Sequence, residues 1–250
     1  MSLGYWLGYE PNGNKLADVP KNIDVVALAF GLTAPNNTLS MHFLTQAHSE
    51  EEIRAGIKVL QARGQKVILS INGDPNLPDH KYGWENLDPN AFAASVRQMV
   101  IDWGFDGIDL DNEAEYTPEA KADGNFILVI KAIRAALGPK PLMTTCAYMG
   151  QSRDLYLNYV MNELNAVYTM AYWNGFDDQM SLMKDYASLV GPAKAGIGVA
   201  MEGAANPGQD TDFSIVSPLA ALSGKVGMML WHLNSPSAQK WCDAIFGSMP

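Results

Sequence analysis

The chain has 250 residues, of which 48% are hydrophobic and 18% are charged. This is enough apolar sequence for one sizeable core, so we expect residues 1–250 to form a single domain. No apolar run reaches the length of about 18 residues that a membrane span needs. The net charge of -10 would repel nucleic acid and anionic membranes, which leaves a neutral or cationic partner or a role in solubility alone.

Cysteine and histidine give little support for a metal site or a disulfide. Cys146 and Cys242 have neither metal-ligand spacing nor the pattern of a disulfide framework. Cys146 lies in an apolar run, as a small core residue would. The histidines are scattered along the chain. We therefore expect no metal and no cofactor.

Short apolar runs alternate with longer amphipathic segments along the whole chain. The short runs predict strands near Leu3–Gly8, Val25–Phe30, Lys66–Ile71, Gly104–Leu110, Leu142–Ala147, Ala166–Tyr172, Ala195–Ala200 and Val226–Trp231. Helical spacing is clearest at Glu51–Arg63, Asn90–Trp103, Gly124–Leu137, Asp177–Leu189 and Ser214–Leu222.

This alternation predicts an α/β fold, a single (β/α)8 TIM barrel. The main competitor is a doubly wound open sheet, which normally carries a glycine-rich phosphate loop after its first strand. The segment at that place, Glu10-Pro11-Asn12-Gly13-Asn14, is not such a loop. The first crossover is short, so its helix can be only a turn.

A row of acids ends the fourth predicted strand. Asp109, Asp111 and Glu113 share one face of that strand, while Ile108 and Leu110 share the other. Buried charges are costly unless they are paired. A solvated edge strand or nearby bases would relieve the cost, but a closed barrel has no edge and no run of bases is present. The row therefore indicates catalysis or metal binding at the carboxyl end of a barrel strand.

The acids, with Asp106 before them, form the pattern Asp-x-x-Asp-x-Asp-x-Glu. In this the sequence resembles glycoside hydrolase family 18, the chitinases and endo-β-N-acetylglucosaminidases. Further segments look like other motifs of that family: Ser70-Ile71-Asn72-Gly73 after the third predicted strand, Met170-Ala171-Tyr172, Ala29-Phe30 and Trp231.

The resemblance implies a role for each catalytic residue. Glu113 would protonate the glycosidic oxygen and later act as base towards water. The acetamido carbonyl of the substrate would replace a protein nucleophile, with retention of configuration. Asp111 would hold the acetamido N–H, Asp109 would share a proton with Asp111, and Tyr172 would donate to the acetamido oxygen.

The resemblance also implies the substrate contacts, and two positions depart from the family pattern. The implied contacts are Trp231, Phe30, Met170, Asn72, Trp173 and Asn174. Asn72 replaces the first glycine of the strand-three motif, where it is either accommodated or narrows the site. Trp173 stands where chitinases commonly have Asp or Asn, with Asn174 one step later.

Aromatic residues are the other candidates for sugar contacts. Trp231 at the end of the last predicted strand can stack on a sugar ring, or it can be a core residue. Trp84, Tyr82 and Trp173 fit sugar binding and packing equally well, whereas Trp103 at a helix end is expected to pack.

Two substrates remain open. The connection Met201–Asp212 leaves no room for the α+β insertion of many processive chitinases, so we expect an open groove and internal cleavage of chitin. The acidic continuation through Glu115 and Tyr116 also resembles endo-β-N-acetylglucosaminidases that cleave the chitobiose core of N-glycans. We expect a single catalytic domain that is a secreted monomer, although the N-terminus lacks a signal pattern.

Two functions of other classes remain. A carbohydrate-binding protein without turnover could use the same barrel, but such relatives usually lack the terminal acid that Glu113 supplies here. A metal-dependent enzyme could use Asp109, Asp111 and Glu113 as ligands of Mg2+ or Mn2+, although no second cluster completes the shell.

Overall fold

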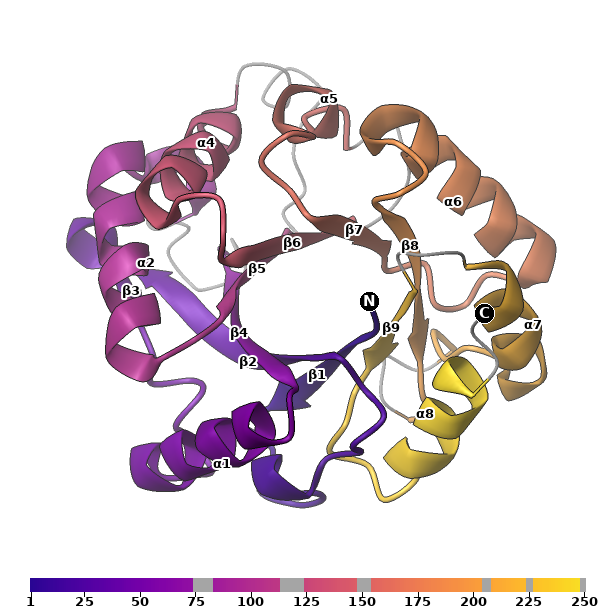
Figure 1. The fold of residues 1–250 in the computed structure, drawn as a ribbon. Coiled ribbons are helices and arrows are strands. Elements are labelled where there is room, and N and C mark those ends of the chain that lie inside the picture. The colour runs from indigo at the N-terminus through magenta and orange to yellow at the C-terminus, as the bar shows by residue number, and fades with distance from the viewer. Residues whose placement is uncertain (74–82, 113–123, 148–153, 204–207, 224–226, 248–250) are drawn as a thin grey trace.

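Eight parallel strands close into a barrel in the computed structural model of the chain (Figure 1). The structure describes residues 1–73, 83–112, 124–147, 154–203, 208–223 and 227–247. The barrel closes because β1 pairs with both β2 and β9, which confirms the predicted (β/α)8 barrel. Its strands are β1 (Leu3–Leu7), β2 (Val25–Ala34), β4 (Lys66–Asn72), β5 (Gly107–Asp111), β6 (Leu142–Ala147), β7 (Ala166–Thr169), β8 (Ala195–Ala200) and β9 (Met228–Trp231).

One further strand lies outside the barrel proper. The strand β2 continues past the predicted end at Phe30, and the chain then turns through Pro35–Asn37 into β3 (Thr38–Ser40). The strand β3 pairs antiparallel with the end of β2. The sequence pattern missed this hairpin because its strand is short and partly exposed.

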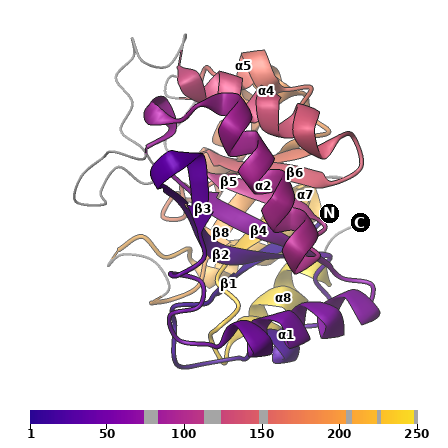
Figure 2. The ribbon, with the colours of Figure 1, turned by 90° about the vertical axis from the view of Figure 1, so that its left-hand side faces the viewer.

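Helices cover the outside of the barrel (Figures 1 and 2). The first crossover contains only the 3-10 turn η1 (Leu16–Asp18), as its length predicts. Two described helices, at Leu157–Val160 and Ala238–Phe246, lie outside the segments with the clearest helical pattern. The described α-helices are α1 (Glu50–Ala62), α2 (Pro89–Trp103), α4 (Asn125–Leu137), α5 (Leu157–Val160), α6 (Phe176–Val190), α7 (Val216–Leu222) and α8 (Ala238–Phe246). None of these described helices has the length and apolarity needed to span a bilayer.

Local signals fix the helix ends. Ser49 and Glu52 form a capping box at the start of α1, and Asp88 accepts a hydrogen bond from the N–H of Ala91 at the start of α2. Gly104 ends α2 with a φ of 72°, a left-handed conformation that glycine adopts readily. Because Gly104 belongs to this cap, β5 begins at Gly107 and not at the predicted Gly104.

The buried apolar side chains of the described residues form two separate clusters. The larger one lies between the strands and the helices and contains Ile108 and Leu110 of β5. The smaller one fills the barrel interior and contains Tyr5, Tyr168 and Met170. The alternation of β5 therefore turns its apolar residues outward, as predicted, and its acids inward.

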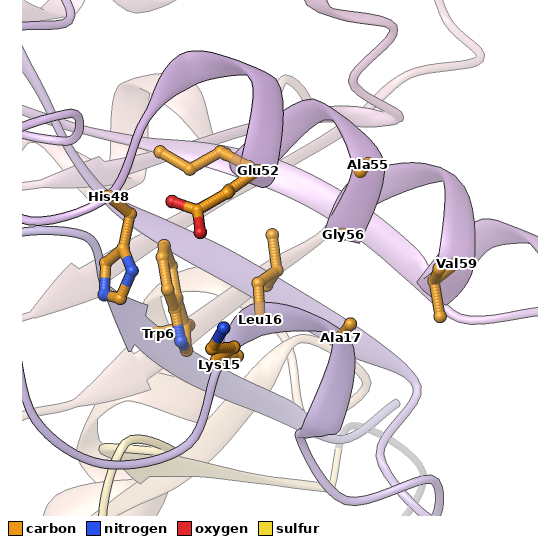
Figure 3. Close-up of a pocket in the computed structure, with 10 residues that line it drawn as sticks. Trp6, Lys15, Leu16, Ala17, His48, Glu52, Ala55, Gly56 and Val59 are labelled. Carbon is orange, nitrogen blue, oxygen red and sulfur yellow. The ribbon is translucent and has the colours of Figure 1, made fainter.

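A small cavity in the outer layer is separate from the barrel interior (Figure 3). It has a volume of about 190 Å³ and lies between η1 and α1, with Trp6 on its floor and Lys15, His48 and Glu52 around it. The short first crossover explains it, because η1 covers less of β1 than a full helix would.

Candidate active site

Asp109 lies at the centre of the barrel and is fully buried. Its carboxylate accepts hydrogen bonds from the hydroxyls of Tyr5 (2.7 Å), Ser70 (2.8 Å) and Thr144 (2.6 Å). Burial raises the pKa of Asp109, and the three donors oppose that rise only in part. The barrel interior therefore favours a proton on this acid.

Tyr5 connects Asp109 to the rest of the interior. Burial, together with the nearby Asp109, Cys146 and Asp111, raises the pKa of Tyr5 well above its usual value. The phenol therefore stays protonated and acts as a donor to Asp109. Its oxygen also lies 2.8 Å from Sγ of Cys146, so this thiol is a core residue, as predicted.

Asp111 ends β5 on the same face and is 4% exposed. It lies opposite Asn72 in the β4–β5 register, and Nδ2 of Asn72 donates a hydrogen bond of 3.0 Å to its Oδ2. The barrel therefore accommodates Asn72 in place of the glycine through a direct contact with the acid row. The glycine that follows is more constrained, because a Cβ at Gly73 would lie 2.3 Å from the ring of Trp84.

Glu113, the expected general acid, lies outside the described residues, as do Tyr82, Glu115 and Tyr116.

Aromatic and apolar side chains adjoin the acids inside the barrel. Phe30, Met170 and Tyr172 belong to the interior cluster, and Trp231 packs against it. The rings of Phe30 and Trp231 stack with centroids 6.0 Å apart, and Trp231 also lies 5.3 Å from the ring of Tyr5. The structure thus brings these four predicted residues together around the interior that holds Asp109.

Trp173 and Asn174 are placed differently. Both lie in the turn between β7 and α6, where Trp173 is 38% exposed and Asn174 is half-buried. Neither belongs to the cluster of described interior side chains. The ring of Trp173 is therefore exposed beyond the end of β7.

Two rings that the sequence did not single out extend the aromatic group. Tyr9 follows β1 and Phe43 follows β3, and their ring centroids are 4.5 Å apart. Both rings stack near Phe30, at 6.3 and 6.5 Å. Both are half-buried. Sequence offers no periodic signal for them, because they lie in two loops that are distant in sequence and meet only in the fold, where Ala47 donates to the carbonyl of Gly8.

Two other tryptophans have packing roles. Trp84 is 1% exposed and contacts Phe92 and Phe126, so it is not an open sugar platform. Trp103 is buried and stacks on Phe105, in agreement with the expectation that it packs.

Asp106, the first acid of the motif, lies at the opposite end of β5. Its carboxylate accepts hydrogen bonds from Lys66, from the N–H of Val67 and from Gln61. Burial raises its pKa, but these donors outweigh burial and leave the pKa below its usual value. Asp106 therefore ties β5 to β4 and takes no part in the interior site.

Within the described ranges, no group of three or more His, Cys, Asp and Glu side chains is arranged to hold a metal ion. Glu113 is not among the side chains to which this applies.

The chain is similar to known proteins in sequence and in fold. Over 167 residues the chain is 29% identical to Exochitinase 1 of Streptomyces olivaceoviridis, a match that covers 57% of this chain and 27% of the relative. The chain spans less than half the length of this relative. A GH18 chitinase from Pseudoalteromonas aurantia superposes with a TM-score of 0.80 at 23% identity, covering 99% of each chain.

A second solved structure, a GH18 chitinase from Cycas revoluta in complex with (GlcNAc)3, gives a TM-score of 0.80 at 13% identity. That match also covers 99% of each chain. At these identities the two structures support the barrel fold alone. The sequence profile of glycosyl hydrolases family 18 matches residues 1–213. The chain, with Asp109 and Asp111 buried on β5, belongs to glycosyl hydrolases family 18.

Proposed function

We propose that this protein hydrolyses β-1,4-linked N-acetylglucosamine glycans, with chitin as its substrate. The observation that carries the proposal is the pair Asp109 and Asp111, buried on the inner face of β5 beside Tyr5 and Asn72. Relatives named chitinases and a solved chitinase complex with (GlcNAc)3 support the same substrate class.

The reaction is substrate-assisted and retains configuration at the anomeric carbon. Glu113 protonates the glycosidic oxygen while the substrate's acetamido oxygen attacks the anomeric carbon. The departing sugar then leaves an oxazolinium-like intermediate. Glu113 next takes a proton from a water molecule, whose oxygen attacks the anomeric carbon and opens that intermediate. Glu113 is then protonated again, as at the start.

The remaining catalytic side chains act on the acetamido group. Asp111 accepts a hydrogen bond from its N–H, and Tyr172 donates to its oxygen. Asp109 shares a proton with Asp111, because two neighbouring buried carboxylates do not easily both ionise. The raised pKa of Asp109, caused by burial, supports this division.

Sugar binding uses the rings and the apolar wall of the interior. Trp231, stacked on Phe30, offers an aromatic face to the sugar, and Met170 lines the same cluster. Oδ1 of Asn72 is buried without a hydrogen-bond partner among the described residues, so it can accept from a sugar hydroxyl or amide. Trp173 and Asn174 contact the sugar on the reducing side.

We further propose internal cleavage, by a single catalytic domain that acts as a secreted monomer. Between β8 and η4 (Phe213–Ile215) the chain has only residues 201–212, which favours an open groove. The name of the relative Exochitinase 1 points to chain-end cleavage in that protein. Product sizes from a long oligomer therefore decide the mode of cleavage.

The second candidate substrate is the chitobiose core of N-glycans. The acidic continuation through Glu115 and Tyr116 favours it, because it resembles that of enzymes that cleave this core. Trp173, in place of the usual acid or amide, is compatible with either substrate. The catalytic groups would be the same.

Parallel digestion tests the proposal. Wild type and Glu113→Gln are incubated with (GlcNAc)6 and with a high-mannose glycoprotein, and the products are identified by mass spectrometry. We expect wild type to release short chitin oligomers and the variant to lose orders of magnitude in rate. Equal rates in the two proteins would exclude Glu113 as the acid. Release of glycans from the glycoprotein alone would establish the second substrate instead.

A further inference from the structure

Asn72 on β4, one of the two positions that depart from the family pattern, lies opposite the acid Asp111 of β5. Neighbouring strands place donors opposite acids in a regular way: Ser70 faces Asp109, and Asn72 faces Asp111. Each of these β4 side chains donates to the acid that it faces. A glycine at position 72 would have no side chain with which to make the second contact.

The contact joins two buried groups. Asn72 is 7% exposed and Asp111 is 4% exposed, and Nδ2 lies 3.0 Å from Oδ2. An amide N–H that donates to a carboxylate stabilises the charged form of the acid, and more strongly in a buried site than in water. If the Asn72 amide were flipped, its Oδ1 would face Oδ2 of Asp111. This contact would be repulsive unless the Asp111 carboxyl group were protonated.

The surroundings of the two interior acids therefore favour different protonation states. Burial raises the pKa of Asp109 despite its three donors, which favours the proton on that acid. Asp111 at the same time receives a donor that favours its charge. A charged Asp111 next to a protonated Asp109 is the arrangement that can accept an acetamido N–H.

We propose that Asn72 is a positioning residue that keeps the Asp111 carboxylate charged and in a fixed orientation. The inference builds on the proposed function, in which Asp111 receives the acetamido group. It differs from a sugar contact of Asn72, because it acts through Asp111 before any substrate arrives.

The direct test is the titration of Asp111, followed by carboxyl 13C NMR of aspartate-labelled protein. The signal of Asp111 is assigned by its loss in Asp111→Asn. In Asn72→Ala we expect Asp111 to take up its proton about one pH unit higher than in wild type, since a hydrogen bond to a charged group is lost. Asn72→Asp keeps the size of the side chain but removes the donor and adds charge, so it should move the titration at least as far upward.

Gln65 offers a matched control. It is also a buried amide, and Nε2 donates to the carbonyls of Pro20 and Ile23, while Oε1 has no hydrogen-bond partner among the described residues. It lies just before β4, at the opposite end of the strand from Asn72. Gln65→Ala should lower stability without moving the titration of Asp111.

An unchanged midpoint in Asn72→Ala, or a midpoint at lower pH, would overturn the inference. The second of these results would mean that Asp111 donates to the amide oxygen. The titration of Asp111 does not require the enzyme to turn over substrate. If wild type cleaved no chitin oligomer, the proposed function would be wrong, but the titration would still test the role of Asn72.

Kinetics then connect the contact to catalysis. On (GlcNAc)6 we expect Asn72→Ala to lose about tenfold in kcat, with its acid limb displaced upward and a smaller change in KM. A displaced titration with kcat and pH profile equal to those of wild type would contradict a positioning role.

Discussion

The two sides of the barrel wall have different chemistry. Between strands and helices the packing is apolar, with Ile108, Leu110 and Ile130 fully buried in one continuous cluster. Inside the barrel, the apolar cluster is interrupted by Asp109 and Asp111 and by the hydroxyls and the amide that donate to them. One strand, β5, contributes to both sides through simple alternation.

This difference separates stability from chemistry. The outer layer stabilises the fold by removing apolar surface from water. In the interior, burial of Asp109 costs part of that stability, and it raises the pKa of the Asp109 carboxyl group. Substitutions on the two sides should therefore have different effects, and the following predictions test that division from the largest expected effect to the smallest.

Asp111→Asn should affect activity far more than stability. The amide keeps the size of the side chain but cannot supply the charge that the acetamido group requires. We expect kcat on (GlcNAc)6 to fall by about 10²–10⁴-fold. The free energy of unfolding, from urea titration, should change by less than about 1 kcal/mol. A variant with wild-type kcat would remove Asp111 from the mechanism.

Ile130→Ala should have the reverse effect. Ile130 lies on α4 in the outer cluster and is fully buried. Truncation leaves a cavity, so the free energy of unfolding should fall by about 2–5 kcal/mol in urea titration. Well below the unfolding temperature, kcat should stay at the wild-type value. Loss of kcat without loss of stability would show that the two sides are not separable.

His232→Gln should reduce the loss of stability at low pH. Burial lowers the pKa of His232 to about 4. Since the unfolded chain takes up this proton near pH 6.5, the folded state loses stability as the pH falls from about 6.5 to about 4. Wild type should lose on the order of 2 kcal/mol more than His232→Gln over that window, because partial exposure weakens the effect. Parallel urea titrations at pH 7 and pH 4 measure it, and identical losses would contradict the burial of this ring.

Tyr9→Leu should have the smallest effect and should act on binding. If the rings of Tyr9 and Phe43 extend the aromatic surface at Phe30, removal of one ring should raise KM for (GlcNAc)6 about two- to tenfold without changing kcat. Phe105→Leu is a suitable control, because Phe105 stacks on Trp103 in the outer layer. An equal rise of KM in both variants would point to a general loss of structure.

Much of the fold could be predicted from the sequence because it depends on local periodicity. The eight barrel strands, the faces of β5 and the short first crossover all follow from patterns within a few residues. The β2–β3 hairpin could not be predicted, because Thr38–Ser40 is short and its pairing is decided by tertiary contacts. The strand β7 ends at Thr169, earlier than the apolar run through Tyr172 suggests.

The acids of the site could be predicted from the sequence, but the hydrogen bonds donated to them could not. Asp109 and Asp111 are visible as alternating charges, and the residues around Phe30 and Trp231 are visible through resemblance. The donations from Thr144 and Asn72 depend on the register between neighbouring strands, and Tyr5 reaches Asp109 from β1, a strand that does not pair with β5. The role of Trp84 was open for the same reason, and its burial against Phe126 became evident only in the fold.

The most direct test of the account uses the acetamido group itself. Wild type is incubated with (GlcNAc)6 and with the fully deacetylated hexamer at equal concentration, and cleavage is followed by mass spectrometry. If the acid row acts through the acetamido group, the acetylated oligomer is cleaved orders of magnitude faster. Cleavage of both oligomers at similar rates would contradict substrate assistance and, with it, the roles of Asp111 and Asp109.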